Sequence, residues 1–103
     1  MKEKTRYQIR NNSIKLLHFL YLNMDEYLGC HNIDLTNYGD RNTYEDNNMC
    51  LIYLYESQYV TNPSLCINAF DDKQIINCHI TASGIDCVED YNRKINNHHQ
   101  RYS

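Results

Sequence analysis

Proline, glycine and tryptophan are scarce in this chain. Its 103 residues include one Pro, three Gly and no Trp, too few turn-forming residues for a loop-dominated β-sandwich or a linker-rich protein. The rest of the composition, 42% hydrophobic and 22% charged, is typical of a globular protein and argues against wholesale disorder. A chain of this length has room for one hydrophobic core, so we expect a single domain.

Long apolar runs are also missing. No segment approaches the ~18 apolar residues that a membrane-spanning helix needs. A secretory signal has an apolar stretch after its charged N-terminal residues. No such stretch follows the charged segment from Met1 to Arg6. These absences predict a protein of the cytoplasm, or of the host cytoplasm if the chain is viral, with no membrane partner.

The cysteines form no recognisable metal or disulfide pattern. They are odd in number, and no Cys-x-x-Cys pair occurs. In a strand, Cys30-His31 and Cys78-His79 would each point their two side chains apart, which is poor geometry for a shared zinc ion. We expect no metal and no cofactor, and we interpret the cysteines as small core residues in a reducing compartment. They are Cys30, Cys50, Cys66, Cys78 and Cys87.

Sequence signatures of catalysis are absent as well. The chain has no G-x-S-x-G, no P-loop, no H-E-x-x-H and no glycine-rich phosphate loop. A Cys/His nucleophile pair would have to combine Cys78 or Cys87 with His18 or His79, and nothing singles one out. We therefore expect a protein that is not an enzyme, and no small-molecule substrate is evident.

The spacing of apolar residues predicts two helices in the first part of the chain. The first begins after Ser13, a plausible N-cap, and carries a broad apolar stripe through residues 14–24. It follows a basic arm over residues 1–12. Residues 32–39, which end in Gly39, are predicted to form a short second helix.

A third helix is predicted from its cap. Thr43 with Asp46 three positions later is a variant of the capping box, and it opens a helix that runs to Gln58. Its predicted core face consists of Cys50, Leu51, Leu54 and Tyr55. Three further large residues lie toward the flank of this helix: Met49, Ile52 and Tyr53. They could be buried under a neighbouring hairpin or could contact a partner, and the sequence favours neither alternative.

The second part of the chain predicts a hairpin and a last helix. Asn62-Pro63 indicates a turn, and residues 65–70 and 74–80 alternate around the polar turn 71–73, which is typical of a two-stranded β-hairpin. Thr81 then caps a helix from Ala82 to about Asn96. The domain thus spans residues 13–96, with a flexible tail over 97–103.

At this point the chain resembles the winged helix-turn-helix superfamily, as found in small phage and regulator proteins. The resemblance rests on Leu54–Val60 at the end of the third helix, on the hairpin as wing, and on Ile80-Thr81-Ala82-Ser83-Gly84-Ile85. It implies an α+β, winged-helix-like fold of three helices, a two-stranded β-hairpin wing and a C-terminal helix. In such proteins the Thr caps the last helix and the Gly allows close passage over the sheet.

The resemblance also implies a small transcription regulator that binds double-stranded DNA, and the small size and odd composition favour a viral or mobile-element origin. The third helix would read the major groove and the wing would contact the backbone. The residues expected at DNA are Arg41, Asn42, Thr43, Tyr44, Asn47, Asn48 and Lys73, supported by Lys4, Arg6 and Arg10. Helices after a wing can also form dimers, which would use Ile85, Val88, Tyr91 and Ile95.

The charge distribution opposes DNA binding. Residues 25–72 contain nine acidic side chains and one basic one, Arg41, whereas residues 1–24 carry a net charge of +4 and residues 73–103 a net charge of +1. An acidic helix and wing are repelled by phosphates. The alternative is an acidic module, such as a viral or plasmid inhibitor that mimics the charge of DNA, which binds a basic nucleic-acid-handling host protein. Its expected contact residues are Glu45, Asp46, Met49, Ile52, Tyr53, Glu56, Asp71 and Asp72.

Overall fold

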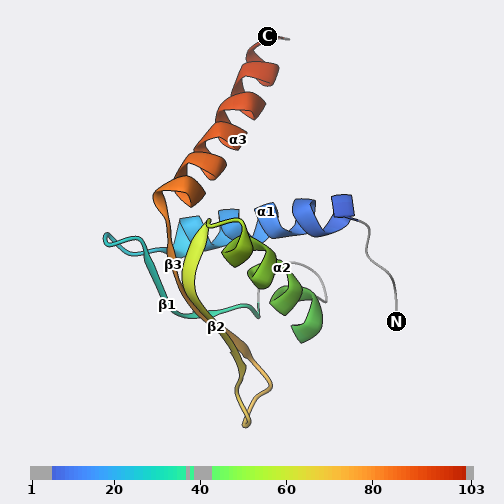
Figure 1. The fold of residues 1–103 in the computed structure, drawn as a ribbon, viewed down its shortest axis with the longest axis vertical. Coiled ribbons are helices and arrows are strands. Elements are labelled where there is room, and N and C mark those ends of the chain that lie inside the picture. The colour runs from blue at the N-terminus through green and yellow to red at the C-terminus, as the bar shows by residue number, and fades with distance from the viewer. Residues whose placement is uncertain (1–5, 37, 39–42, 102–103) are drawn as a thin grey trace.

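The computed structural model describes residues 6–36, 38 and 43–101; for residues 6, 7 and 96–101 it describes the backbone alone. Within them the chain is an α+β fold of three helices and one three-stranded antiparallel sheet (Figure 1). In chain order the elements are α1 (Arg6–Asn23), β1 (Gly29–Asp34), α2 (Tyr44–Glu56), β2 (Val60–Ile67), β3 (Gln74–Ile80) and α3 (Ala82–Arg101).

The first helix starts earlier than predicted. Because α1 already begins at Arg6, Ser13 is not its N-cap but an interior residue that is fully buried. It lies about one turn before the buried Leu16 and Leu17, so its small side chain belongs to the face that packs on the domain. Residues 6–12 of the predicted arm are therefore helical. At the other end α3 continues beyond Asn96 to Arg101.

The sheet has one strand more than the predicted hairpin. Its strand order is β1-β3-β2, with β3 in the centre. The expected short helix over residues 32–39 is wrong, because residues 29–34 pair with β3 instead, with Cys30 opposite Cys78 and Ile33 opposite Ile76. Pairing with β1 covers the edge of β3 that a two-stranded hairpin would leave open.

The predicted turn at Asn62-Pro63 lies inside β2. The pairing of β2 with β3 shifts register between Thr61 and Ser64, and Asn62 there has a positive φ of 49°. Such a bulge accommodates proline, which has no N–H to donate to a strand ladder. β3 itself covers residues 74–80 as predicted.

The core lies between the sheet and the helices. α1 contributes Leu16, Leu17 and Leu20, and α2 contributes Leu51 and Leu54. Tyr55, which was expected in this core, is 54% exposed because the buried face of α2 runs through Asn47, Cys50, Leu51 and Leu54. Cys30, Cys50 and Cys78 are buried as expected, whereas Cys66 is exposed and Cys87 is half-buried.

The junction between β3 and α3 follows the expected motif. The Thr81 hydroxyl accepts a hydrogen bond from the Gly84 amide at 3.0 Å, which confirms Thr81 as the cap of α3. A Cβ on Gly84 would overlap the carbonyl oxygen of Tyr59 and lie 2.9 Å from Ile80 Cγ2. Only glycine therefore permits this close approach of α3 to the start of β2.

Candidate interaction surface

The start of α2 is fixed by its own side chains. The Asp46 amide donates to the Thr43 hydroxyl at 3.0 Å, and the Asp46 carboxylate accepts from the Thr43 amide at 3.4 Å. This is the predicted capping box, now confirmed. Glu45 and Asp46 both lie in the first turn, where the helix dipole favours negative charge.

Two of the residues expected to contact DNA are engaged within the domain. Asn47 is 3% exposed, and its side-chain amide donates to the Gln74 Oε1 at 2.7 Å. The Tyr44 hydroxyl donates to the Leu65 carbonyl at 3.2 Å. Both bonds attach α2 to the hairpin of β2 and β3, and neither group faces solvent freely. Asn48 is half-exposed.

Of the cations expected at DNA, the structure describes the side chains of Lys73 and Arg10. The Lys73 ammonium, just before β3, lies 3.7 Å from an Asp34 carboxylate oxygen and 4.0 Å from one of Asp71. Arg10 lies in a cleft between α1 and α3. Lys4, Arg41 and Asn42 lie outside the described residues, and of Arg6 only the backbone is described.

The solvent side of α2 carries an apolar stripe, defined here as Met49, Ile52 and Tyr55, which are 38%, 52% and 54% exposed. Their spacing of three residues keeps them on one side of the helix. The hairpin does not cover Met49 or Ile52, whereas Tyr53 is half-buried and packs against the core. The alternative that Met49 and Ile52 are buried beneath the hairpin is therefore wrong, and contact with a partner remains the other alternative.

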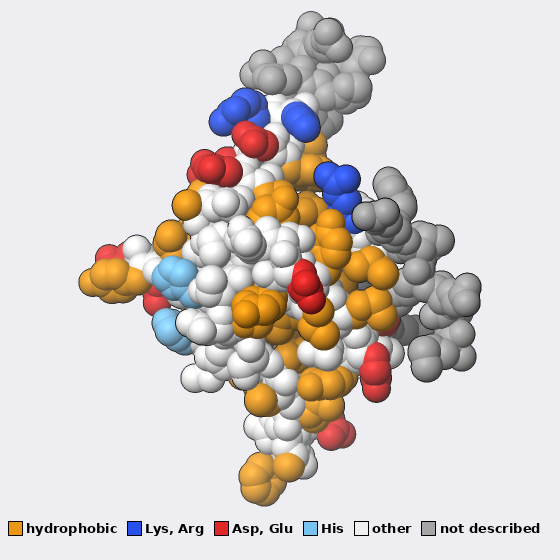
Figure 2. Space-filling view, in the orientation of Figure 1, with side chains coloured by type: hydrophobic (Ala, Val, Ile, Leu, Met, Phe, Trp, Pro, Cys, Tyr) orange, Lys and Arg blue, Asp and Glu red, His pale blue; other side chains and the backbone are white. Residues whose placement is uncertain are grey.

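Acidic residues frame this α2 stripe. Glu45 and Glu56 are exposed at the two ends of α2, and Asp71 and Asp72 are exposed in the hairpin turn. Between residues 43 and 81 the one cationic side chain is Lys73. In Figure 2 the face over α2 and the strands shows orange and red side chains, while the blue ones gather toward α3 and the start of α1.

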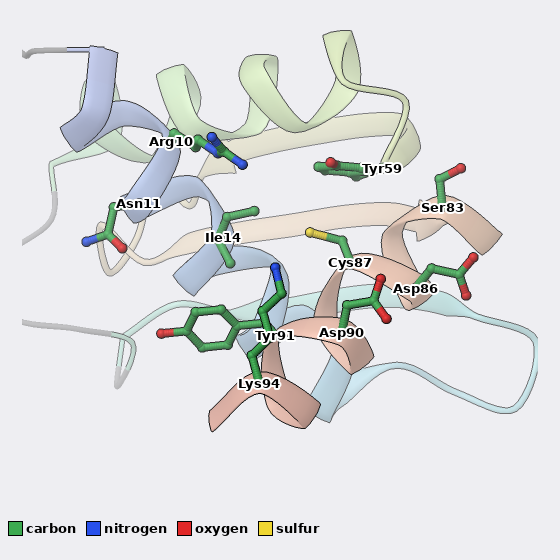
Figure 3. A pocket seen from close by; sticks show the side chains of 10 residues that line it. All are labelled: Arg10, Asn11, Ile14, Tyr59, Ser83, Asp86, Cys87, Asp90, Tyr91 and Lys94. Carbon is green, nitrogen blue, oxygen red and sulfur yellow. The ribbon is translucent and has the colours of Figure 1, made fainter. Parts of the chain in front are cut away.

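The residues expected for a dimer divide between two environments. Val88 is 1% exposed and belongs to the core, and Ile85 packs against it. Tyr91 and Ile95 are 48% and 40% exposed on α3, which leads away from the body of the domain (Figure 1). Tyr91 also lines the cleft between α1 and α3 (Figure 3), a site that the sequence patterns gave no reason to expect.

The described part of the chain contains neither a metal-binding cluster nor a membrane-spanning helix. No group of three or more His, Cys, Asp or Glu side chains there is arranged to hold a metal ion. None of the described helices is long and apolar enough to cross a membrane. Comparison of the chain with protein families, with curated proteins and with solved structures finds no match.

Proposed function

We propose that this chain is a non-enzymatic protein-binding module with a winged-helix-like fold, whose α2 stripe and acidic surroundings bind a basic partner protein. One observation carries the proposal: Met49, Ile52 and Tyr55 are exposed in a row on α2, with Glu45 and Glu56 at its two ends. The winged-helix assignment is supported by the order of α2, hairpin and α3 and by the Thr81-Gly84 junction.

The apolar and charged parts of this surface would have different roles. Burial of exposed Ile, Met and Tyr surface favours association by about 25 cal/mol per Å² of apolar area, before the costs of association are subtracted. The carboxylates act at longer range, because charge complementarity mainly accelerates encounter and selects partners. A basic groove on a nucleic-acid-handling protein would supply the apolar contacts for the α2 stripe and the positive charge for the carboxylates.

A small DNA-binding regulator is the second candidate. The observation in its favour is the position of α2 directly before the hairpin, where the resemblance places the reading helix. Against it stand the burial of Asn47, the ion pairs of Lys73 and the carboxylates on α2. Phosphate contacts from Lys and Arg supply most non-specific DNA affinity, and α2 has neither residue.

The two candidates respond oppositely to charge reversal on α2. We would measure fluorescence anisotropy with a mixed-sequence duplex and with a helical peptide of alternating Lys and Leu blocks, at low and moderate salt. Under the proposal Glu56→Lys weakens peptide binding about three- to ten-fold, whereas the matched surface change Glu26→Lys does so much less. Salt-sensitive duplex binding that Glu56→Lys strengthens, without peptide binding, would favour the regulator.

A further inference from the structure

The cleft between α1 and α3 has the dimensions of a small-molecule site. The cleft is open to solvent and has a volume of about 520 Å³, within the range of roughly 300–1,000 Å³ that such sites occupy. Ile14, Tyr59 and Cys87 are half-buried in it, while the charged residues around them are exposed. None of its lining residues belongs to the α2 stripe or to the hairpin, so it is independent of the surface proposed above.

Opposite charges lie toward opposite ends of this cleft. Figure 3 shows Arg10 from α1 and Lys94 from α3 toward one end, Asp86 with Ser83 toward the other, and Asp90 between them. Asp90 pairs at 3.3 Å with Arg93, which does not line the cleft. Among the described residues neither Arg10 nor Lys94 takes part in an ion pair. The charges of Arg10, Lys94 and Asp86 thus remain available to a ligand.

One wall of the cleft is formed by Tyr59, whose backbone is held by hydrogen bonds. The Tyr59 amide donates to the Leu54 carbonyl at 2.9 Å, and the Thr81 amide donates to the Tyr59 carbonyl at 3.0 Å. Gly84 packs directly against that carbonyl. Burial, with a smaller contribution from Cys87, raises the pKa of the Tyr59 hydroxyl above its ordinary value of 10.0.

We propose that this cleft binds a small zwitterion of the ω-amino carboxylate class, with its carboxylate and ammonium at opposite ends of an apolar body. The carboxylate would lie between Arg10 and Lys94 and the ammonium toward Asp86. Ile14, Tyr59 and Tyr91 would contact the body. At 1.5 Å of rise per residue, Asp90 and Asp86 lie about 6 Å and 12 Å along α3 from Lys94. An α-amino acid without a charged side chain, whose ammonium and carboxylate are attached to one carbon, cannot reach both ends.

Each charge of the ligand would contribute separately. A ligand with only the carboxylate leaves Asp86 unpaired, and a ligand with only the ammonium leaves Arg10 and Lys94 unpaired. Removal of either charge should weaken binding about ten-fold, the change that corresponds to about 1.4 kcal/mol. The fixed position of Tyr59 limits the ordering that the protein must undergo on binding, which favours affinity.

The test uses the full chain and 4-(aminomethyl)benzoate, a rigid zwitterion with a ring between its charges. Benzoate and benzylamine serve as probes that lack one charge each. Titration calorimetry should show saturable binding of the zwitterion and about ten-fold weaker binding of both controls. Amide NMR shifts on saturation should centre on Tyr59, Ser83 and Cys87. Absence of saturation by about 10 mM, or equal binding of benzoate or benzylamine, would overturn the proposal.

Matched variants locate the site. Lys94→Gln and Asp86→Asn change exposed side chains, and each should weaken binding of the zwitterion at least about five-fold. Lys15→Gln, which removes an exposed cation of α1 outside the cleft, should leave binding unchanged. Circular dichroism melts verify that all three variants are folded. Equal affinity of the Lys94→Gln and Lys15→Gln variants would place any bound probe elsewhere and reject the assignment.

Discussion

The Thr81 hydroxyl donates a 2.6 Å hydrogen bond to the Gln58 carbonyl and at the same time accepts one from the Gly84 amide. One side chain therefore caps α3 and attaches it to the segment that follows α2. Gln58 has a positive φ of 65°, so the chain turns sharply there before β2. This hydroxyl therefore helps to fix the placement of α3 relative to α2 and β2, together with the Thr81 amide and Gly84.

Loss of that hydroxyl should destabilise the domain. Thr81→Ala removes the helix cap and leaves the Gln58 carbonyl without this donor, so the free energy of unfolding should fall by about 1–2 kcal/mol. Thr81→Ser keeps the hydroxyl and should retain most of the stability. Urea denaturation followed by circular dichroism measures both. Equal loss in the two variants would mean that the Thr81 methyl group, not its hydroxyl, matters.

Gly84→Ala should be destabilising although alanine favours helices. Inside an exposed helix this change gains about 1 kcal/mol. Here the added Cβ overlaps the Tyr59 carbonyl, and forced displacement of packed backbone typically costs about 1–3 kcal/mol. The net effect should be a lower melting temperature. Ser83→Ala, at an exposed position of the same helix turn, is the control and should be neutral or slightly stabilising. A Gly84→Ala variant that melts higher than wild type would contradict the described packing.

Asn47→Ala distinguishes a structural asparagine from one that reads bases. Because the Asn47 amide is buried against Gln74, its loss should lower the unfolding free energy by about 1–3 kcal/mol. Asn48→Ala, at the half-exposed neighbouring position, should change stability by less than about 0.5 kcal/mol. Chemical denaturation of the pair provides the comparison. If the two variants were equally stable, the Asn47–Gln74 hydrogen bond would contribute nothing to the free energy of unfolding.

The local motifs were predictable from sequence because each depends on residues close in the chain. Thr43 with Asp46, and Thr81 with Gly84, are defined within four residues, and both form as expected. β1 was missed because its alternation is interrupted. Asn32 has a positive φ of 53° and its amide donates to the Asn77 side chain, so the register with β3 shifts in the middle of the strand.

Other features depend on contacts between distant residues and could not be predicted in this way. Asn47 lies on the same face of α2 as Cys50, Leu51 and Leu54, but its hydrogen-bond partner Gln74 belongs to another element and could not be identified from the sequence. Ser13 has the residue type of a cap, yet the packing of α1 places it in a helix interior. The residues that line the α1–α3 cleft are as far apart in the chain as Arg10 and Lys94, and no sequence motif spans such a separation.

Acid should weaken the turn between α1 and β1. The Gly29 and Tyr27 amides donate to the Asp25 carboxylate, at 3.0 Å and 2.8 Å, and these bonds hold its pKa below the ordinary value of 3.8. A carboxyl whose pKa is lower in the folded state contributes stability above its unfolded pKa and loses it as the pH falls through the folded pKa. The contribution of Asp25 should therefore be complete above about pH 5 and decline below pH 3.8.

Asp25→Asn tests this dependence, because its amide oxygen can still accept the two backbone bonds but does not titrate. The variant should show a shallower loss of unfolding free energy between about pH 5 and pH 2 than wild type in urea titrations. Glu26→Gln removes a neighbouring exposed carboxylate for which no hydrogen bond is found among the described residues, and it should leave the slope unchanged. Parallel slopes for wild type and Asp25→Asn would show that other carboxylates determine the acid sensitivity. A steeper slope for the Asn variant would reverse the sign of the linkage.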